Sequence, residues 1–121
     1  MSADYKMLAE RYIATWNSPA EERAARMEDV LAADVFYADP IVAVRGHAEL
    51  AAYIERTMSR FDGMRFSVPG AVDGHHDQMR FVWHIGPPGA GPAFTGLDVA
   101  LVEGPRITAV YGFFDRYGFF D

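Results

Sequence analysis

The sequence contains no cysteine, so the chain can form neither a disulfide framework nor a thiolate metal site. Positive charge is also scarce, because 11 lysines and arginines stand against 17 acidic residues and give a formal net charge of -6. Acidic and basic residues are mixed along the chain, which argues against a surface for nucleic acid or for an anionic membrane. We therefore expect any specific partner to be apolar or neutral.

Long hydrophobic runs are absent as well. No stretch is long enough to span a bilayer, and residues 1–6 lack the basic start and apolar run of a secretory signal, so we expect a cytoplasmic protein. The composition does supply 50% hydrophobic and 14% aromatic residues over 121 positions, which is enough for one buried core. We interpret the chain as a single domain over residues 1–121.

Helical periodicity marks three segments in the first half of the sequence. Apolar residues recur every three or four positions over 5–16, which predicts a helix. Residues 18–21 fit a capping box with proline at the first helical position, and we expect a second helix from there through Leu31. Gly46 precedes a third amphipathic segment, whose apolar positions lie within 50–61.

Runs typical of β-strands make up the rest. A short run at 35–38 ends at Asp39, which the following proline biases toward an extended backbone. Four further runs are separated by glycines and prolines, at 64–73, 78–85, 93–103 and 106–117. Helices first and strands after, with no βαβ alternation, indicate an α+β fold with an antiparallel sheet. We expect the helices to pack on a curved sheet around an apolar pocket.

Three polar side chains lie where the pattern predicts apolar neighbours: Tyr12 on the inward helical face, Asp39 at a strand end and Asp98 inside a strand. A carboxylate in an apolar cavity can shuttle a proton, and a second carboxyl, kept neutral by desolvation, can donate to an oxyanion beside a phenol. Each residue also has a structural interpretation. Tyr12 is typical of a core, Asp39 of a turn, and Asp98 of a wet sheet face, since both faces of its strand are partly apolar.

A resemblance to a known family rests on three short motifs, which are residues 10–17, residues 37–40 with Gly46 after them, and residues 96–98. They resemble the landmarks of the SnoaL-like branch of the NTF2-like superfamily, in an order similar to that of ketosteroid isomerase. The resemblance covers nearly the whole chain in the order of its elements. It implies a cone of three helices on a curved mixed or antiparallel sheet.

The resemblance also implies a reaction and a role for each of the three polar residues. Asp39 matches the family's general base, Tyr12 its oxyanion-hole tyrosine and Asp98 its protonated aspartic acid, for which ketosteroid isomerase is the best-known case. The implied substrate is a small apolar or aromatic carbonyl compound, from which a proton next to the carbonyl is removed and returned to another carbon. No cofactor and no metal would take part, and a homodimer is expected because dimers are common in this fold family.

Aromatic residues are expected to shape the pocket, whose predicted lining residues are Trp16, Tyr37, Tyr53, Phe61, Trp83 and His84. Trp16 lies one helical turn after Tyr12 and would narrow the cavity, which favours a ligand smaller or flatter than a steroid. A polyketide-cyclase-like or dehydratase-like reaction is therefore an alternative. A second alternative is a non-catalytic module that holds a hydrophobic ligand or forms a dimer through the outer sheet face.

The remaining unusual residues have simpler interpretations. His75 and His76 follow a predicted hairpin turn, and adjacent strand residues point to opposite faces, so a shared metal site is not expected. His84 is either an acid or base in the pocket or an ordinary histidine of the surface or core. The sequence Tyr-Gly-Phe-Phe-Asp occurs at 111–115 and again at 117–121, and we expect it to seal the pocket mouth or to form a dimer contact.

Overall fold

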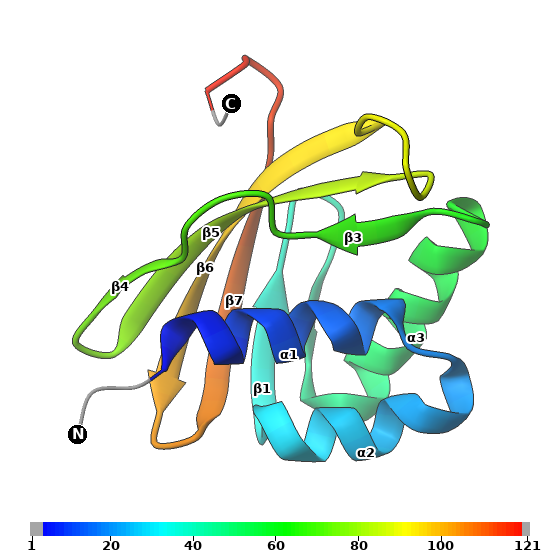
Figure 1. Ribbon diagram of the computed structural model, residues 1–121. Coiled ribbons are helices and arrows are strands. Elements are labelled where there is room, and N and C mark those ends of the chain that lie inside the picture. The colour runs from blue at the N-terminus through cyan, green and yellow to red at the C-terminus, as the bar shows by residue number, and fades with distance from the viewer. Residues whose placement is uncertain (1–3, 120–121) are drawn as a thin grey trace.

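The structure is a computed structural model that describes residues 4–119. Within these residues, three helices lie on one side of a curved seven-stranded sheet (Figure 1). The helices are α1 (Tyr5–Asn17), α2 (Ala20–Val30) and α3 (Gly46–Arg60). The strands are β1 (Leu31–Ala38), β2 (Ala43–Arg45), β3 (Arg65–Ser67), β4 (Asp73–His75), β5 (Gln78–Gly86), β6 (Phe94–Glu103) and β7 (Arg106–Phe114). This arrangement confirms the predicted α+β class.

The predicted helix over 5–16 is confirmed, and its N-terminus is capped by Asp4, whose side chain accepts from the Met7 backbone N–H at 3.0 Å. The predicted capping box at residues 18–21 is wrong. Ser18 instead ends α1 by donating its hydroxyl to the Thr15 carbonyl oxygen, and no side chain caps α2. The second helix also ends one residue earlier than expected, because Leu31 is the first residue of β1.

The sheet is mixed, with the strand order β2-β1-β7-β6-β5-β3, and β4 pairs with β5 beside this path. Of the two predicted possibilities, a mixed or an antiparallel sheet, the mixed sheet is observed, because β1 and β7 pair in parallel while the other neighbours are antiparallel. Period-two alternation identifies strands but does not say which strands are neighbours, and here the first strand lies beside the last. The parallel pairing places the end of β1, and therefore Asp39, next to β7.

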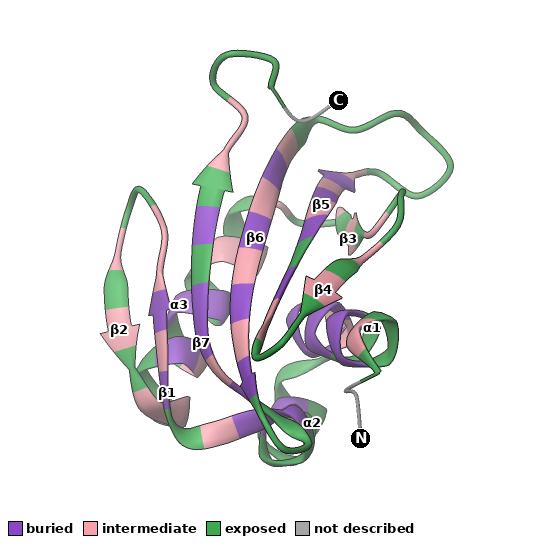
Figure 2. Cartoon of the chain, turned by 90° about the vertical axis from the view of Figure 1, so that its left-hand side faces the viewer, coloured by how far each residue is buried: buried purple, intermediate pink, exposed green. Residues whose placement is uncertain are grey.

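The remaining strands follow the predictions with local differences. The run at 64–73 contains β3 but is interrupted by Pro69 and Gly70. Asp73 and Gly74, predicted to separate two strands, instead belong to β4, and both β3 and β4 pair with β5. The short strand β2 was not predicted, and β7 ends at Phe114, three residues before the expected boundary of 117. In Figure 2, buried and intermediate residues alternate along β6, as expected for a sheet with one covered face.

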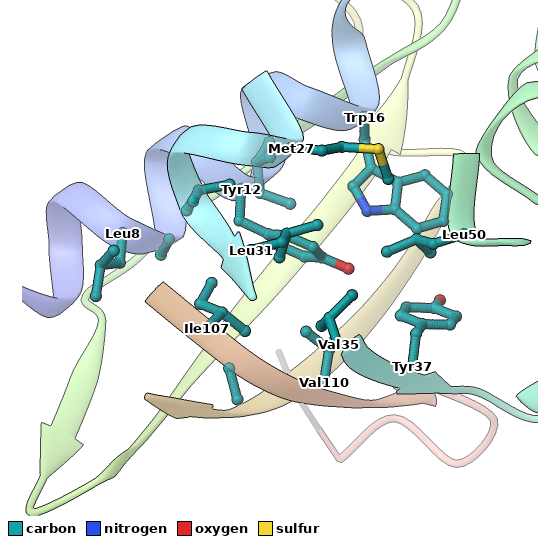
Figure 3. Packing of buried hydrophobic residues seen from close by; sticks show 14 of the residues in the cluster. Leu8, Tyr12, Trp16, Met27, Leu31, Val35, Tyr37, Leu50, Ile107 and Val110 are labelled. Carbon is teal, nitrogen blue, oxygen red and sulfur yellow. The ribbon is translucent and has the colours of Figure 1, made fainter. Parts of the chain in front are cut away.

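The core lies between the helices and the covered face of the sheet, and Figure 3 shows part of it. Leu8, Tyr12 and Trp16 from α1 meet Met27 from α2 and Leu50 from α3 over Val35, Ile107 and Val110 of the sheet. Arg23 of α2 is buried as well, and its guanidinium donates to the Ser18 carbonyl oxygen at 2.9 Å. In the described part of the chain, no helix is both long and apolar enough to cross a membrane.

Candidate functional site

A cavity of about 570 Å³ opens between α1, α3 and the covered face of the sheet. This volume lies in the range of sites that hold small molecules. Five of the six predicted lining residues face it, namely Trp16, Tyr37, Tyr53, Phe61 and Trp83. The prediction is wrong for His84, because this residue alternates with Trp83 and Ile85 along β5 and so faces the other side of the sheet.

Asp39 lies directly after β1 and lines the cavity. Its Oδ2 accepts from the hydroxyl groups of Tyr37 at 2.6 Å and Tyr53 at 2.7 Å. Its Oδ1 accepts from the backbone N–H groups of Ile41 at 2.8 Å and Val42 at 3.1 Å. Asp39 is therefore both the turn residue and the cavity carboxylate that the sequence suggested as alternatives, and four donors hold its charge.

The two phenols that bind Asp39 are held in their neutral, donating form. Burial is the main cause that raises the pKa of the Tyr53 hydroxyl, and the hydrogen bond to Asp39 and the charge of Asp39 add to it. Burial likewise raises the pKa of Tyr37 well above its ordinary value, with smaller contributions from Tyr12, Asp98 and Asp39. Both side chains thus present O–H donors at the cavity wall.

The sequence left open which face of its strand Asp98 occupies. Its side chain faces inward and is only 6% exposed. The Trp83 indole Nε1 donates to Asp98 Oδ1 at 3.0 Å. Burial raises the pKa of the Asp98 carboxyl to about 7, the charge of Asp39 adds to the rise, and the hydrogen bond from Trp83 opposes it. A carboxyl with such a pKa exchanges protons near neutral pH.

Two glycines determine how these side chains fit, and the sequence reasoning missed both. Gly96 is paired with Trp83, and a Cβ at Gly96 would overlap the indole ring. Gly112 is paired with Asp98, and a Cβ there would lie 3.0 Å from Asp98 Oδ1 and 3.3 Å from Asp39 Cβ. The two acids therefore stand on either side of Gly112. The available signal was the position of each glycine inside a strand, which is typical of close approach.

Tyr12 is absent from the residues that line the cavity, but its hydroxyl lies close enough to Asp98, Asp39 and Tyr53 for these groups to raise its pKa. Its side chain is 1% exposed, and its hydroxyl forms no hydrogen bond within the described residues. In Figure 3 this hydroxyl points into the packed core between Trp16 and Val35. Burial raises the Tyr12 pKa well above its ordinary value, followed by the charge of Asp98, whereas the nearby Trp16 indole opposes the rise. Trp16, one turn later, occupies the cavity wall instead.

The adjacent histidines also differ from the expectation that they point to opposite faces. The Nδ1 atoms of His75 and His76 lie 2.9 Å apart, because His76 adopts a positive φ of 53° in the turn after β4. Gln78 adds a side-chain contact to His75 at 3.1 Å. Over residues 4–119, no group of three or more histidine, aspartate or glutamate side chains is arranged to hold a metal ion.

The unpartnered hydroxyl of Tyr12 leads to a stability prediction. Tyr12→Phe should leave the free energy of unfolding unchanged or raise it by about 1 kcal/mol, because it removes a buried hydroxyl that has no hydrogen bond. Tyr37→Phe is the matched control and should lower it by about 1–3 kcal/mol, since Asp39 loses a donor. Urea denaturation measures both changes. A clear loss of stability in Tyr12→Phe would mean that this hydroxyl has a partner.

The raised pKa of Asp98 leads to a second prediction. Between about pH 4 and 7 the folded chain keeps a proton on Asp98 that the unfolded chain has released. The contribution of Asp98 to the free energy of unfolding should therefore fall as pH rises, by at most about 1.4 kcal/mol per pH unit, until about pH 7. Asp98→Asn should remove this fall. In denaturation experiments, the free energy of unfolding of the variant should therefore rise relative to that of the wild type between pH 5 and 8. Asp34→Asn, which changes an exposed carboxyl, is the control; equal pH curves for wild type and Asp98→Asn would contradict the prediction.

Comparison with known proteins places this site in a family. The sequence profile of the SnoaL-like domain matches residues 9–110. Among solved structures, a candidate isomerase of the SnoaL-like family from Agrobacterium tumefaciens str. C58 is similar, with 33% identity and a TM-score of 0.86 over 92% of this chain and 97% of that one. No curated protein matches the sequence significantly.

More distant structures share the fold. A candidate ketosteroid isomerase from Kribbella flavida DSM 17836 has 20% identity and a TM-score of 0.67, over 91% of this chain and 76% of that one. AclR, a candidate hydroxylase from Streptomyces galilaeus, has 11% identity and a TM-score of 0.67, over 94% and 90% of the two chains. At these identities the likeness concerns the fold alone. With its profile match over most of the sequence and a relative of 33% identity, the chain belongs to the SnoaL-like family.

Proposed function

We propose that this protein is an isomerase that moves a proton from the carbon next to a carbonyl group to another carbon of a small apolar substrate. The observation that carries the proposal is the pair of carboxyl groups at the cavity, Asp98 and Asp39, which stand on either side of Gly112. Their surroundings differ strongly. The raised pKa of Asp98, about 7, together with a second carboxyl group beside it, suits a proton transfer near neutral pH.

The two acids can supply both a base and a hydrogen-bond donor. Asp98 holds the proton, because burial and the charge of Asp39 both favour its neutral form. Asp39 carries the negative charge, which four hydrogen bonds stabilise. This division supports Asp39 as the general base and Asp98 as the hydrogen-bond donor to the substrate oxygen.

The proposed reaction has two proton transfers. Asp39 Oδ2 takes the proton from the carbon between the carbonyl group and a β,γ double bond of the substrate. The electron pair of that C–H bond forms a new C=C bond to the carbonyl carbon, the π pair of the carbonyl moves to its oxygen, and the product is a dienolate whose γ carbon can accept the proton. Protonated Asp98 donates a hydrogen bond to this oxygen. Asp39 then returns the proton to a different carbon, so the isomerisation is redox-neutral and consumes no co-reactant.

The phenols of Tyr37 and Tyr53 have a part in this step, because both donate to the Oδ2 atom of Asp39. A proton that arrives at Oδ2 displaces one of these hydrogen bonds. The released hydroxyl faces the cavity and can donate to the enolate oxygen, which is the task first expected of Tyr12. We therefore leave Tyr12 out of the groups that contact the substrate.

A non-catalytic ligand-binding module of the same fold is the main competing interpretation. It predicts no carboxyl group with a shifted pKa at the cavity, whereas Asp98 is buried, shifted to a pKa of about 7 and set beside a second acid. The name of the Agrobacterium relative, a candidate isomerase, also supports the enzymatic interpretation.

Activity measurements on small β,γ-unsaturated ketones test the proposal, with ultraviolet absorbance reporting the conjugated product and proton NMR reporting exchange of the α-hydrogen with D₂O. Asp39→Asn should lower kcat/KM by about 10²–10⁴-fold because it removes the base. Wild-type kcat/KM should fall above about pH 7, as Asp98 loses its proton, and Asp98→Asn should lack this alkaline fall.

Two controls make the outcome decisive. Asp34→Asn should retain wild-type activity, and Tyr12→Phe should stay within about threefold, because the Tyr12 hydroxyl lies outside the cavity lining. Full activity in Asp39→Asn, or absence of α-hydrogen exchange with every ketone tested, would overturn the proposal. A loss of more than tenfold in Tyr12→Phe would return this phenol to the oxyanion site.

A further inference from the structure

The mouth of the cavity carries positive charge although the chain as a whole is acidic. Three arginines line it: Arg56 and Arg60 near the end of α3, and Arg116 just after β7. Exposed apolar side chains lie between them, and Ile41 and Phe94 are 61% and 55% exposed. A chain with a formal net charge of -6 thus presents a cationic and apolar entrance.

The two arginines of α3 follow the cavity-facing stripe of that helix. Tyr53, Arg56, Thr57 and Arg60 are spaced three and four residues apart, and all of them line the cavity. The Arg56 guanidinium lies 5.8 Å from the centre of the Tyr53 ring. The Arg60 guanidinium is close enough to Tyr53 to oppose the rise of its pKa. Both cations therefore act at the cavity rather than pointing away from it.

Ion pairs with nearby acids do not explain why these arginines lie at the cavity. Among residues 4–119, no carboxylate forms an ion pair with Arg56, Arg60 or Arg116, whereas Arg23, Arg26 and Arg80 each have one. Asp115 is the acid that lines the same mouth, and its carboxylate accepts from the Thr95 hydroxyl and from the Phe119 backbone N–H. A favourable position of Arg60 at the C-terminus of α3 explains one cation but not the other two.

The negatively and positively charged groups are thus separated along the depth of the cavity. The acid pair of Asp39 and Asp98 lies at the strand floor, and the arginines lie at the opening. A ligand with an anionic group can enter favourably in only one direction, because its charge is attracted to the mouth and repelled from Asp39.

We propose that the substrate is an amphiphile with an anionic group, whose apolar body fills the cavity while a carboxylate or phosphate binds Arg56, Arg60 and Arg116 at the mouth. This binding mode places the opposite, carbonyl-bearing end of the molecule at Asp98 and Asp39. The inference rests on the proposed function, because it takes the cavity as the substrate site. It narrows the small apolar substrate of that proposal to a molecule whose apolar body carries one anionic group.

Binding of two matched probes tests the inference without any turnover. 6-Hydroxy-2-naphthoate carries a phenolic oxygen at one end and a carboxylate at the other, and its methyl ester lacks the charge and adds only one methyl group. At low ionic strength the acid should bind at least fivefold more tightly than the ester by fluorescence titration, and this advantage should shrink in 0.5 M salt. The phosphate monoester of naphthalene-2,6-diol distinguishes a preference for phosphate from one for carboxylate.

Variants assign the effect to the mouth. Arg56→Gln, Arg60→Gln and Arg116→Gln should each weaken binding of the acid by about two- to fourfold and leave the ester within twofold, and the triple variant should bind both probes equally. Arg11→Gln removes the same charge from an exposed position on α1 outside the cavity lining and should change neither.

Equal affinity of the wild type for acid and ester, or an effect of Arg11→Gln as large as that of the mouth variants, would overturn the inference. These outcomes test the substrate class and not the proposed reaction. Isomerisation of a neutral ketone with no preference for anionic probes would remove the substrate class alone. A charge preference in a protein that exchanges no α-hydrogen would remove the reaction alone.

Discussion

The hydrogen bond from the Trp83 indole to Asp98 is the contact on which the site depends. It fixes one carboxylate oxygen in a place where burial strongly disfavours charge, so the acid keeps a defined position while its pKa remains near 7. The contact exists because Gly96 leaves room for the indole ring against β6. On the other side, Gly112 lets Asp39 approach to complete the pair. The lack of a side chain at Gly96 and at Gly112 thus shapes the site as much as the polar side chains do.

Much of the fold could be predicted from the sequence, since helical spacing in the first half and strand runs in the second half correspond to the observed elements. Periodicity does not show which strands pair with each other. The parallel pairing of β1 with β7 was not foreseen, because it joins segments some 70 residues apart and no local pattern marks it. Ser18 illustrates a similar limit. A residue that suits the start of one helix ended the previous one instead, because both positions lie within a tight connection.

The candidate site could be predicted in part. Both acids face the cavity, but alternation alone did not reveal the orientation of Asp98, because Leu97, Val99 and Leu101 face the outer side of β6 while smaller residues face inward. The smaller residues face inward because the bulky side chain of Trp83 needs the room that Gly96 leaves on the inner face. Tyr12 was expected at the cavity because its helical face was inward. Facing the core and reaching the cavity are different conditions, and on this helical face Trp16 lines the cavity whereas Tyr12 does not.

The place of β1 in the sheet also bears on how the protein matures. Asp39 follows β1, whereas Asp98 lies in β6 and Gly112 in β7, so the strand that joins the two acids comes after both of them in the sequence. Helices α1 and α2 can form early from local contacts, but long-range strand pairing is slow because a large loop must close first. Synthesis must therefore pass β7 before the two acids meet, and a nascent chain that has not reached β7 can be helical without having the acid pair.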